Sequence, residues 1–248
     1  MHSQFLSAHR LLADAVQHRQ HSTGIDDQAM QIVLEIPKPN PPRREDLLAA
    51  AGIAVVQACL IDEAGCDSHY RSHLEMWYDR RIRKITRRAR GAGWRNVQEI
   101  PGVTAHVKGA RARAFIPTAM DDVDPRLRSL QIKGTDLPPT LPAPAPPPVP
   151  HLRVLIDASL RMSLGKAAAQ VGHASMLFAG SLDASACWAW RERGYLLSVA
   201  EVDALSCAQA AHQPGAITVI DAGFTEIAPG SMSCVALWSA GPGALELQ

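Results

Sequence analysis

This chain of 248 residues has little net charge and no paired cysteines. Its 25 Lys and Arg nearly balance 24 Asp and Glu, so the formal net charge of +1 argues against a strongly basic nucleic-acid binder. The five cysteines are an odd number and none forms a CxxC pair. This pattern argues against a disulfide framework and a zinc knuckle, and it indicates a reducing compartment.

Long apolar runs are also missing. No run approaches the length needed to span a bilayer, and residues 1–10 lack the apolar core and cleavage site of a secretory signal. We therefore expect no membrane partner and a cytoplasmic location. Apolar residues at 47% and charged residues at 20% are typical of a globular protein rather than a disordered one.

Proline is concentrated in one segment. Eight of the 18 prolines lie in residues 138–150, PPTLPAPAPPPVP. Such a run lacks N–H donors and fixes φ, so it forms neither a helix nor a central strand. We interpret residues 137–150 as an extended linker rather than a docking site for a proline-binding domain, because specificity-giving flanks are missing.

Division of the chain at this linker separates the charge. Residues 1–136 hold 20 Lys and Arg against 16 Asp and Glu, a net charge of +4, whereas residues 137–248 carry −3. Residues 80–95 hold eight cations and no acid. The near-zero total therefore hides a basic first part and an acidic second part.

The apolar pattern of the first part predicts alternating helices and strands. Residues 1–30 are expected to form a short helix at 4–17 followed by a flexible segment at 18–27. Residues 31–136 are expected to form a basic α/β domain. Its predicted elements are a strand at 31–36, helices at 45–60 and 73–90, and one or two strands at 103–116 around a Gly109 turn.

The second part, residues 151–248, repeats a similar order. Its predicted strands are at 152–156, 195–199, 217–220 and 232–238, and its predicted helices are at 165–179, 184–193 and 202–211. Strands that alternate with helices predict an α/β fold. We expect a three-layer sandwich, with a small mixed sheet flanked by helices, preceded by a second, smaller α/β domain. The first part is either a diverged copy of the second or an independent unit.

The first segment with candidate chemistry is MSLGKAAAQVGHA, residues 162–174. It is not a nucleoside-triphosphate loop, because Leu160 and Ala167 replace the glycine and the hydroxyl residue of that motif. Lys166 lies in the first turn of a helix, where a cation opposes the helix dipole. It is either an ordinary surface lysine or part of an anion or oxyanion site. Gln170 lies one turn further on the same face, and we expect His173 to be structural.

The second segment is VIDAGFTEIAPGSMSCV, residues 219–235. A buried strand ends at Asp221, and Gly223 permits a tight turn. A carboxylate beyond a strand end positions or deprotonates a water molecule, or it only caps the turn. Thr225 and Ser233 bring hydroxyl groups near Asp221 if the turn folds back.

GKAAAQVGHA and DAGFTEIAPGSMS resemble the two characteristic stretches of the type 2 peptidyl-tRNA hydrolases, over residues 152–242. The resemblance implies a small α/β domain that cleaves the ester between a peptide and the terminal ribose of tRNA in bacterial translation. It implies no metal, no cofactor and a homodimer. For this chain the alternative is a pseudo-dimer formed by its two parts. Two departures from the family pattern are Phe224, in place of a basic residue, and Ser233, in place of threonine.

The resemblance also implies roles for residues of this sequence. The catalytic residues are expected to be Lys166, Asp221, Thr225 and Ser233, and the substrate-binding residues Gln170, Gly165 and Gly223. Asp221 would activate water, and Lys166 would stabilise the oxyanion. Two rival functions stay open: a non-catalytic tRNA- or RNA-binding protein on a hydrolase fold, and a deacylase of misacylated tRNA.

The resemblance also suggests a role for the cations of residues 80–95, most of which lie on the predicted helix at 73–90. We expect phosphate contacts to tRNA from Arg80, Arg81, Arg83, Lys84, Arg87 and Arg88, and base stacking from Trp94. The alternative is a solvated, charged helix face.

Overall fold

The computed structural model describes residues 1–17, 28–134, 136–141, 145–223 and 226–239. The predicted flexible segment at 18–27 lies outside them. We call residues 1–136 the first half and residues 151–248 the second half. The helices of the first half are α1 (Ser3–Gln17), α2 (Arg44–Cys59), the 3-10 turn η2 (Asp62–Gly65), α3 (His69–Tyr78), α4 (Gly91–Val97) and α5 (Pro125–Arg128). Its strands are β1 (Gln28–Glu35), β2 (Arg83–Ala89), β3 (Gly102–Val107), β4 (Ala110–Phe115) and β5 (Thr118–Ala119).

The second half contains the elements that the sequence predicts. Its strands are β6 (His151–Asp157), β7 (Leu197–Val202), β8 (Ile217–Ile220) and β9 (Met232–Ser239). Its helices are the 3-10 turn η3 (Ala158–Leu160), α6 (Leu164–Ser181), α7 (Ala184–Glu192) and α8 (Ala204–Ala211). The α/β class with two mixed sheets flanked by helices is confirmed.

The two sheets have the same topology. The first has the order β2-β1-β4-β3, with β5 beside β1, and the second has the order β7-β6-β9-β8. Along both four-strand paths, the first two strands in chain order pair in parallel and the other two pairings are antiparallel. The short strand β5 adds one antiparallel pairing with β1 in the first sheet. A diverged copy requires this order and these directions.

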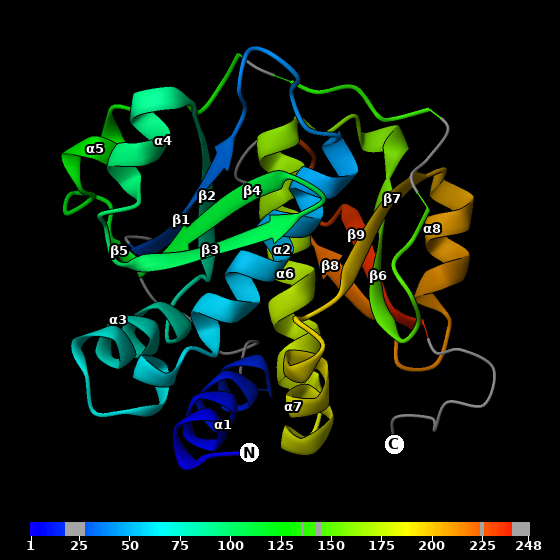
Figure 1. The fold of residues 1–248 in the computed structure, drawn as a ribbon. Helices are drawn as coiled ribbons and strands as arrows, with labels where there is room; N and C mark the ends of the chain where they lie inside the picture. Colours follow the sequence, from blue (N-terminus) through cyan, green and yellow to red (C-terminus); the bar gives the residue numbers. More distant parts are fainter. Residues whose placement is uncertain (18–27, 135, 142–144, 224–225, 240–248) are drawn as a thin grey trace.

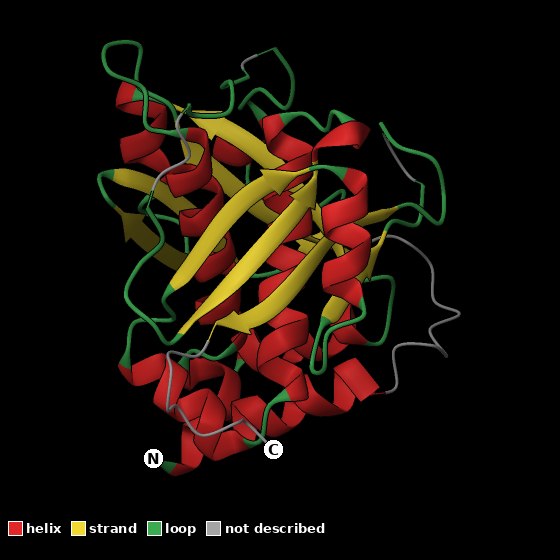
Figure 2. Cartoon of the chain, turned by 90° about the vertical axis from the view of Figure 1, so that its right-hand side faces the viewer, coloured by secondary structure: helices red, strands yellow, loops and turns green. Residues whose placement is uncertain are grey.

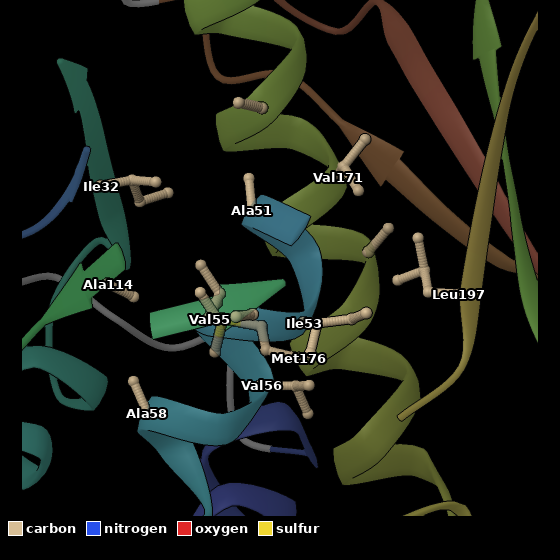
Figure 3. Packing of buried hydrophobic residues seen from close by; sticks show 14 of the residues in the cluster. Ile32, Ala51, Ile53, Val55, Val56, Ala58, Ala114, Val171, Met176 and Leu197 are labelled. Atoms are coloured by element: carbon tan, nitrogen blue, oxygen red, sulfur yellow. The ribbon is translucent and has the colours of Figure 1, made fainter. Parts of the chain in front are cut away.

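Helices α2 and α6 lie side by side between the two sheets (Figure 1). The outer face of the first sheet packs on α4 and α5, and α8 packs on the outer face of the second sheet. The turned view in Figure 2 shows strands of a sheet lying against helices. The largest hydrophobic cluster includes residues of both sheets and both central helices. Side chains such as Ile53 and Met176 meet between the two helix ribbons (Figure 3). The two halves therefore share one core.

Close approach of the two central helices depends on small residues. A Cβ atom at Gly172 would lie 2.9 Å from a methyl group of Val55, and the hydroxyl of Ser175 donates to the carbonyl of Gly52 over 2.8 Å. One segment of the described residues, Arg44–Gly65, is long and apolar enough to cross a membrane, in contrast to our reading of the sequence. Because 78% of this window is buried, it serves as a core helix here.

The predicted helix at 73–90 is wrong. Helix α3 ends at Tyr78, and the basic run continues as strand β2, which pairs with all but the first residue of β1. The four-residue apolar spacing suggested a helix, but the β-branched Ile82, Ile85 and Thr86 favour a strand. Pairing with the buried strand β1 overrides the helical pattern. Trp94 is buried under the first sheet, so the expected base stacking is also wrong.

The described parts of the proline segment lie against the first half. The backbone N–H of Thr140 donates to Glu45 over 2.8 Å, and Lys108 Nζ donates to the carbonyl of Ala145 over 3.2 Å. Just before this segment, Asp136 accepts from Arg44 and from the backbone N–H of Leu164. The connection between the halves is therefore fixed by polar contacts at several points.

Candidate active site

The first turn of α6 places Lys166 at the edge of the second sheet. Ser163 caps the helix by accepting a hydrogen bond from the Lys166 backbone N–H over 3.2 Å, as N-cap serines do. Glu226 in turn accepts from both the backbone N–H and the hydroxyl of Ser163. The cap is therefore tied to the loop that follows Asp221.

Asp221 meets Lys166 across this edge. The Lys166 Nζ lies 2.5 Å from Asp221 Oδ1, and both side chains are more than nine-tenths buried. Gln170 donates to the same oxygen over 2.6 Å. The ion pair offsets the unfavourable position of a cation at a helix N-terminus. Charge-assisted bonds of this kind fix the carboxylate in one orientation.

The loop after β8 completes the arrangement. The backbone N–H of Gly223 donates to Asp221 Oδ2 over 2.9 Å. Gly223 has φ +80°, and a Cβ there would lie 2.3 Å from the ring of Pro229. Only glycine satisfies both conditions. Thr225 lies outside the described residues, as does Phe224.

Ser233 lies behind Gln170 rather than beside the carboxylate. It is fully buried, and its hydroxyl lies 3.0 Å from both Gln170 Oε1 and the carbonyl of Val219. Donation to Oε1 leaves the amide nitrogen of Gln170 directed at Asp221. Beside them, burial raises the pKa of the Cys234 thiol well above its ordinary value, so this thiol stays protonated and is a poor nucleophile.

These side chains open into a cleft of about 430 Å³ between the two halves. Gly165, Lys166, Gln170 and Asp221 form one wall, while Arg83–Thr86 of β2 and the segment Ile132–Lys133 form the other. His173 also lines it, with Nδ1 3.0 Å from the ammonium of Lys84. The sequence reading missed Thr86, Lys133 and Glu226. Glu226 lies within the second motif, where the sequence reading gave it no role, whereas Thr86 and Lys133 belong to no motif and reach the cleft through the packing of the halves.

The predicted tRNA-binding cations do not form one surface. Arg83 and Lys84 line the cleft, and Arg80 and Arg81 lie in the turn before β2. Arg88 points to Gln131. Arg87 is buried and donates to Gln31 and to the carbonyl of Leu130, so its guanidinium is used inside the first half. A strand, unlike a helix, sends alternate residues to opposite faces.

The described residues contain no group of three or more His, Cys, Asp or Glu that could hold a metal ion. The site itself offers a fixed carboxylate, an ammonium and amide donors. A small mixed sheet with such a set at the end of its third strand belongs to the class of α/β domains that hydrolyse or bind polar substrates beyond strand ends.

Comparison with known families identifies one family within this class. Residues 151–245 match the family model described as peptidyl-tRNA hydrolase PTH2. The second half thus carries a domain of this family, which acts on peptidyl-tRNA, and the resemblance inferred from the two motifs is confirmed. The match includes the described site residues Gly165, Lys166, Gln170, Asp221, Gly223 and Ser233. Searches of curated proteins and of solved structures gave no match.

Proposed function

We propose that this chain hydrolyses the ester bond between a peptide, or an N-blocked amino acid, and the 3′-terminal ribose of tRNA. The observation that carries the proposal is the Asp221 carboxylate, held by Lys166, Gln170 and Gly223 within the family-matched region. Such fixed polar groups at a cleft are typical of catalytic centres. The proposal places the chain in the translation machinery of a bacterial cytoplasm.

In the proposed mechanism, Asp221 activates water. Its Oδ1 is occupied by Lys166 and Gln170, but Oδ2 accepts only the Gly223 N–H among the described donors. A carboxylate oxygen has a second lone-pair direction, so Oδ2 can accept a hydrogen of water. The water oxygen bonds to the ester carbonyl carbon while its proton passes to Oδ2.

Lys166 then stabilises the oxyanion. Its ammonium has three N–H donors, and one is directed at Asp221. A second can meet the negative charge that develops on the carbonyl oxygen. The bond to the ribose oxygen breaks, and this oxygen takes up the proton from Asp221. We assign Thr225 to substrate contact by the resemblance alone, and Ser233 to orientation of the Gln170 amide.

Contact with tRNA phosphates falls in this proposal to the cations at and near the cleft. Arg83 and Lys133 line it, and Arg81 is exposed in the turn before β2. The net charge of the second half is negative, so these first-half cations supply the attraction for tRNA. Arg87 is left out of the contact set because its donors are used internally.

The test is ester loss from N-acetyl-aminoacyl-tRNA and from free aminoacyl-tRNA. Hydrolysis of the N-blocked substrate alone supports the proposal, whereas loss of free aminoacyl-tRNA supports the deacylase, and binding without hydrolysis supports the RNA-binding protein. Asp221→Asn should lower kcat by about 10²–10⁴-fold, the usual value of a general base. Asp203→Asn is the matched control, because asparagine also caps α8. Unchanged turnover by Asp221→Asn would refute the mechanism.

A further inference from the structure

The two halves are related residue by residue through the central helices. Ser175 of α6 contacts Gly52 of α2, and Gly172 of α6 lies against Val55. Subtraction of 120 from a residue number in α6 gives the corresponding position in α2. Gly172 then corresponds to Gly52 and Ser175 to Val55, so each of the two contacts is converted into the other. The same helices cross to the other sheet in the same way, since α2 contacts β7 and α6 contacts β2. The halves are therefore arranged like the subunits of a two-fold dimer.

This relation places Asp46 where the second half has Lys166, and Ala50 where it has Gln170. Between β3 and β4, the turn of Lys108 and Gly109 replaces the loop that carries Asp221. Lys108 Nζ lies 3.9 Å from Asp46 Oδ1. The first half thus has the ion pair with its charges exchanged, and no carboxylate is left beyond the third strand for activation of water.

Each half has a cleft at this position. The second cleft, of about 590 Å³, is lined by Asp46 and Lys108 on one side and by Leu197–Ala200 of β7 on the other. Pro146 and Pro147 of the proline segment also line it. Counted from the start of each strand, Lys84 and Thr86 in the first cleft correspond to Ser198 and Ala200 in the second. Only the cleft beside Lys166 combines a polar wall with the proposed catalytic set, by which we mean Lys166, Gln170 and Asp221.

Thr86 has an unsatisfied polar group on that wall. It is 6% exposed, and its hydroxyl has no hydrogen-bond partner among the residues that the structure describes. Thr86 lies beside the first turn of α6, since a Cβ built on Gly165 would be 3.7 Å from Thr86 Cβ. Threonine χ1 has three staggered states, so the hydroxyl can turn toward a ligand. A buried hydroxyl without a partner costs stability, which a bound ligand would restore.

We propose that the active centre is composite: the first half is a second copy of the hydrolase fold without its catalytic set, and its Thr86 binds the terminal ribose of tRNA. This proposal rests on the proposed function. The nucleotide end of the substrate lies on the first-half wall because Arg83 and Lys133 there complement phosphate. Thr86 lines the same cleft as these cations and lies against the first turn of α6, which carries Lys166, so it meets the ribose next to the ester.

The experiment compares Thr86→Val and Thr86→Ser with wild type on two substrates, N-acetyl-aminoacyl-tRNA and N-acetyl-aminoacyl-adenosine. Valine keeps the shape and removes the hydroxyl, so kcat/KM should fall about fivefold on both substrates, the usual effect of one hydrogen bond. Serine should restore most of the loss. Thr118→Val, the same change on β5 outside the cleft, should leave kcat/KM unchanged.

Thermal unfolding separates this role from a structural one. Removal of a buried hydroxyl without a protein partner should leave Tm unchanged or raised in Thr86→Val. A lowered Tm with unchanged kcat/KM would overturn the proposal, as would a loss on the tRNA substrate alone. If wild type hydrolyses neither substrate, the proposed function fails, and the role of Thr86 fails with it. If wild type is active and Thr86→Val equals it, only the composite site is refuted.

Discussion

Arg44 Nε donates to Glu201 Oε1 over 2.8 Å, and this bond joins the start of α2 to strand β7 of the other half. The same guanidinium donates to Asp136 over 2.7 Å and to the carbonyl of Met162 over 2.9 Å. Arg44 itself is 4% exposed. It holds together both halves and the segment that leads into the proline run.

Arg44→Met should therefore destabilise the chain strongly. The change leaves Glu201, 14% exposed, without its cation, and loss of one partner of a buried pair costs about 3 kcal/mol. Urea unfolding measures the loss. Arg126→Met is the control, because that arginine pairs at the surface and should matter little. Equal small losses in both variants would show that Arg44 is not a joining residue.

Replacement of the two lysines should distinguish the clefts. Lys166→Met removes the proposed oxyanion partner and should lower kcat about 100-fold. Lys108→Gln removes the lysine that pairs with Asp46 in the first half, and it should leave kcat unchanged. Hydrolysis of N-acetyl-aminoacyl-tRNA is the measurement, with Tm as the folding check. A comparable loss of kcat in Lys108→Gln would mean that the second cleft also takes part in the reaction.

The loop glycine should be needed for activity more than for folding. Gly223→Ala brings a methyl group against Pro229 at a positive φ, so the loop must move and Asp221 loses its backbone donor. Displacement of a catalytic group by about 1 Å can lower kcat about 100-fold. Gly230→Ala has the same φ of +80° but nothing within 4 Å of its Cβ. It should lose stability through strain, about 1–2 kcal/mol, and keep most activity.

Stability should decrease on mild acidification. Burial, and then the charge of Arg153, lowers the pKa of His151 from its ordinary value of 6.5, so this ring is neutral in the folded chain. As the pH falls through about 6.5, the unfolded chain takes up a proton that the fold excludes, and the free energy of unfolding decreases until the lower folded pKa is reached. His151→Phe should reduce this loss, measured by urea unfolding at pH 7.5 and 5.5.

The control for the effect of substitution on folding is His106→Gln on the exposed side of β3, which should keep the wild-type free energy of unfolding at pH 7.5. Buried His9 contributes in the same direction, because burial lowers its pKa as well. Part of the slope should therefore survive in His151→Phe. An unchanged slope in that variant would contradict the assignment.

The salt dependence of tRNA binding should reveal the phosphate contacts. Lys133→Glu reverses a cleft cation, so binding should weaken and the slope of log Kd against log salt should become shallower by about 1 per lost contact. Lys38→Glu, an exposed lysine outside the cleft lining, makes the same charge change. Equal effects of both variants would point to net charge alone rather than to contacts at the cleft.

Local pattern was enough to predict much of this protein. The Ala-rich run before Cys59 and the small apolar residues after Gly165 predicted the two central helices, because helical spacing of apolar residues is a local property. Likewise, two continuous motifs predicted the family of the second half. Their residues Lys166 and Asp221 are 55 positions apart, and the structure brings them within 2.5 Å.

Whether the basic run forms a helix or a strand depends on its long-range pairing with β1. Residues 83–89 carry an apolar spacing that suits a helix, but β1 offers a complete row of backbone partners beside them. Strand pairing depends on residues far away in the chain, so spacing alone could not predict it. For the same reason, the sequence could not separate Arg87, which is used internally, from Arg83 at the cleft.

The local pattern of residues was sufficient for the elements of the second half, for the two family motifs and for the separation of charge between the halves. The tertiary structure decided that the halves share one core, and that β2 of the first half faces Lys166 across a cleft. It also decided that Asp46 pairs with Lys108 where the other half pairs Lys166 with Asp221. The physical reason is that a motif fixes local geometry, whereas the opposite wall of a site comes from packing between segments that are distant in sequence.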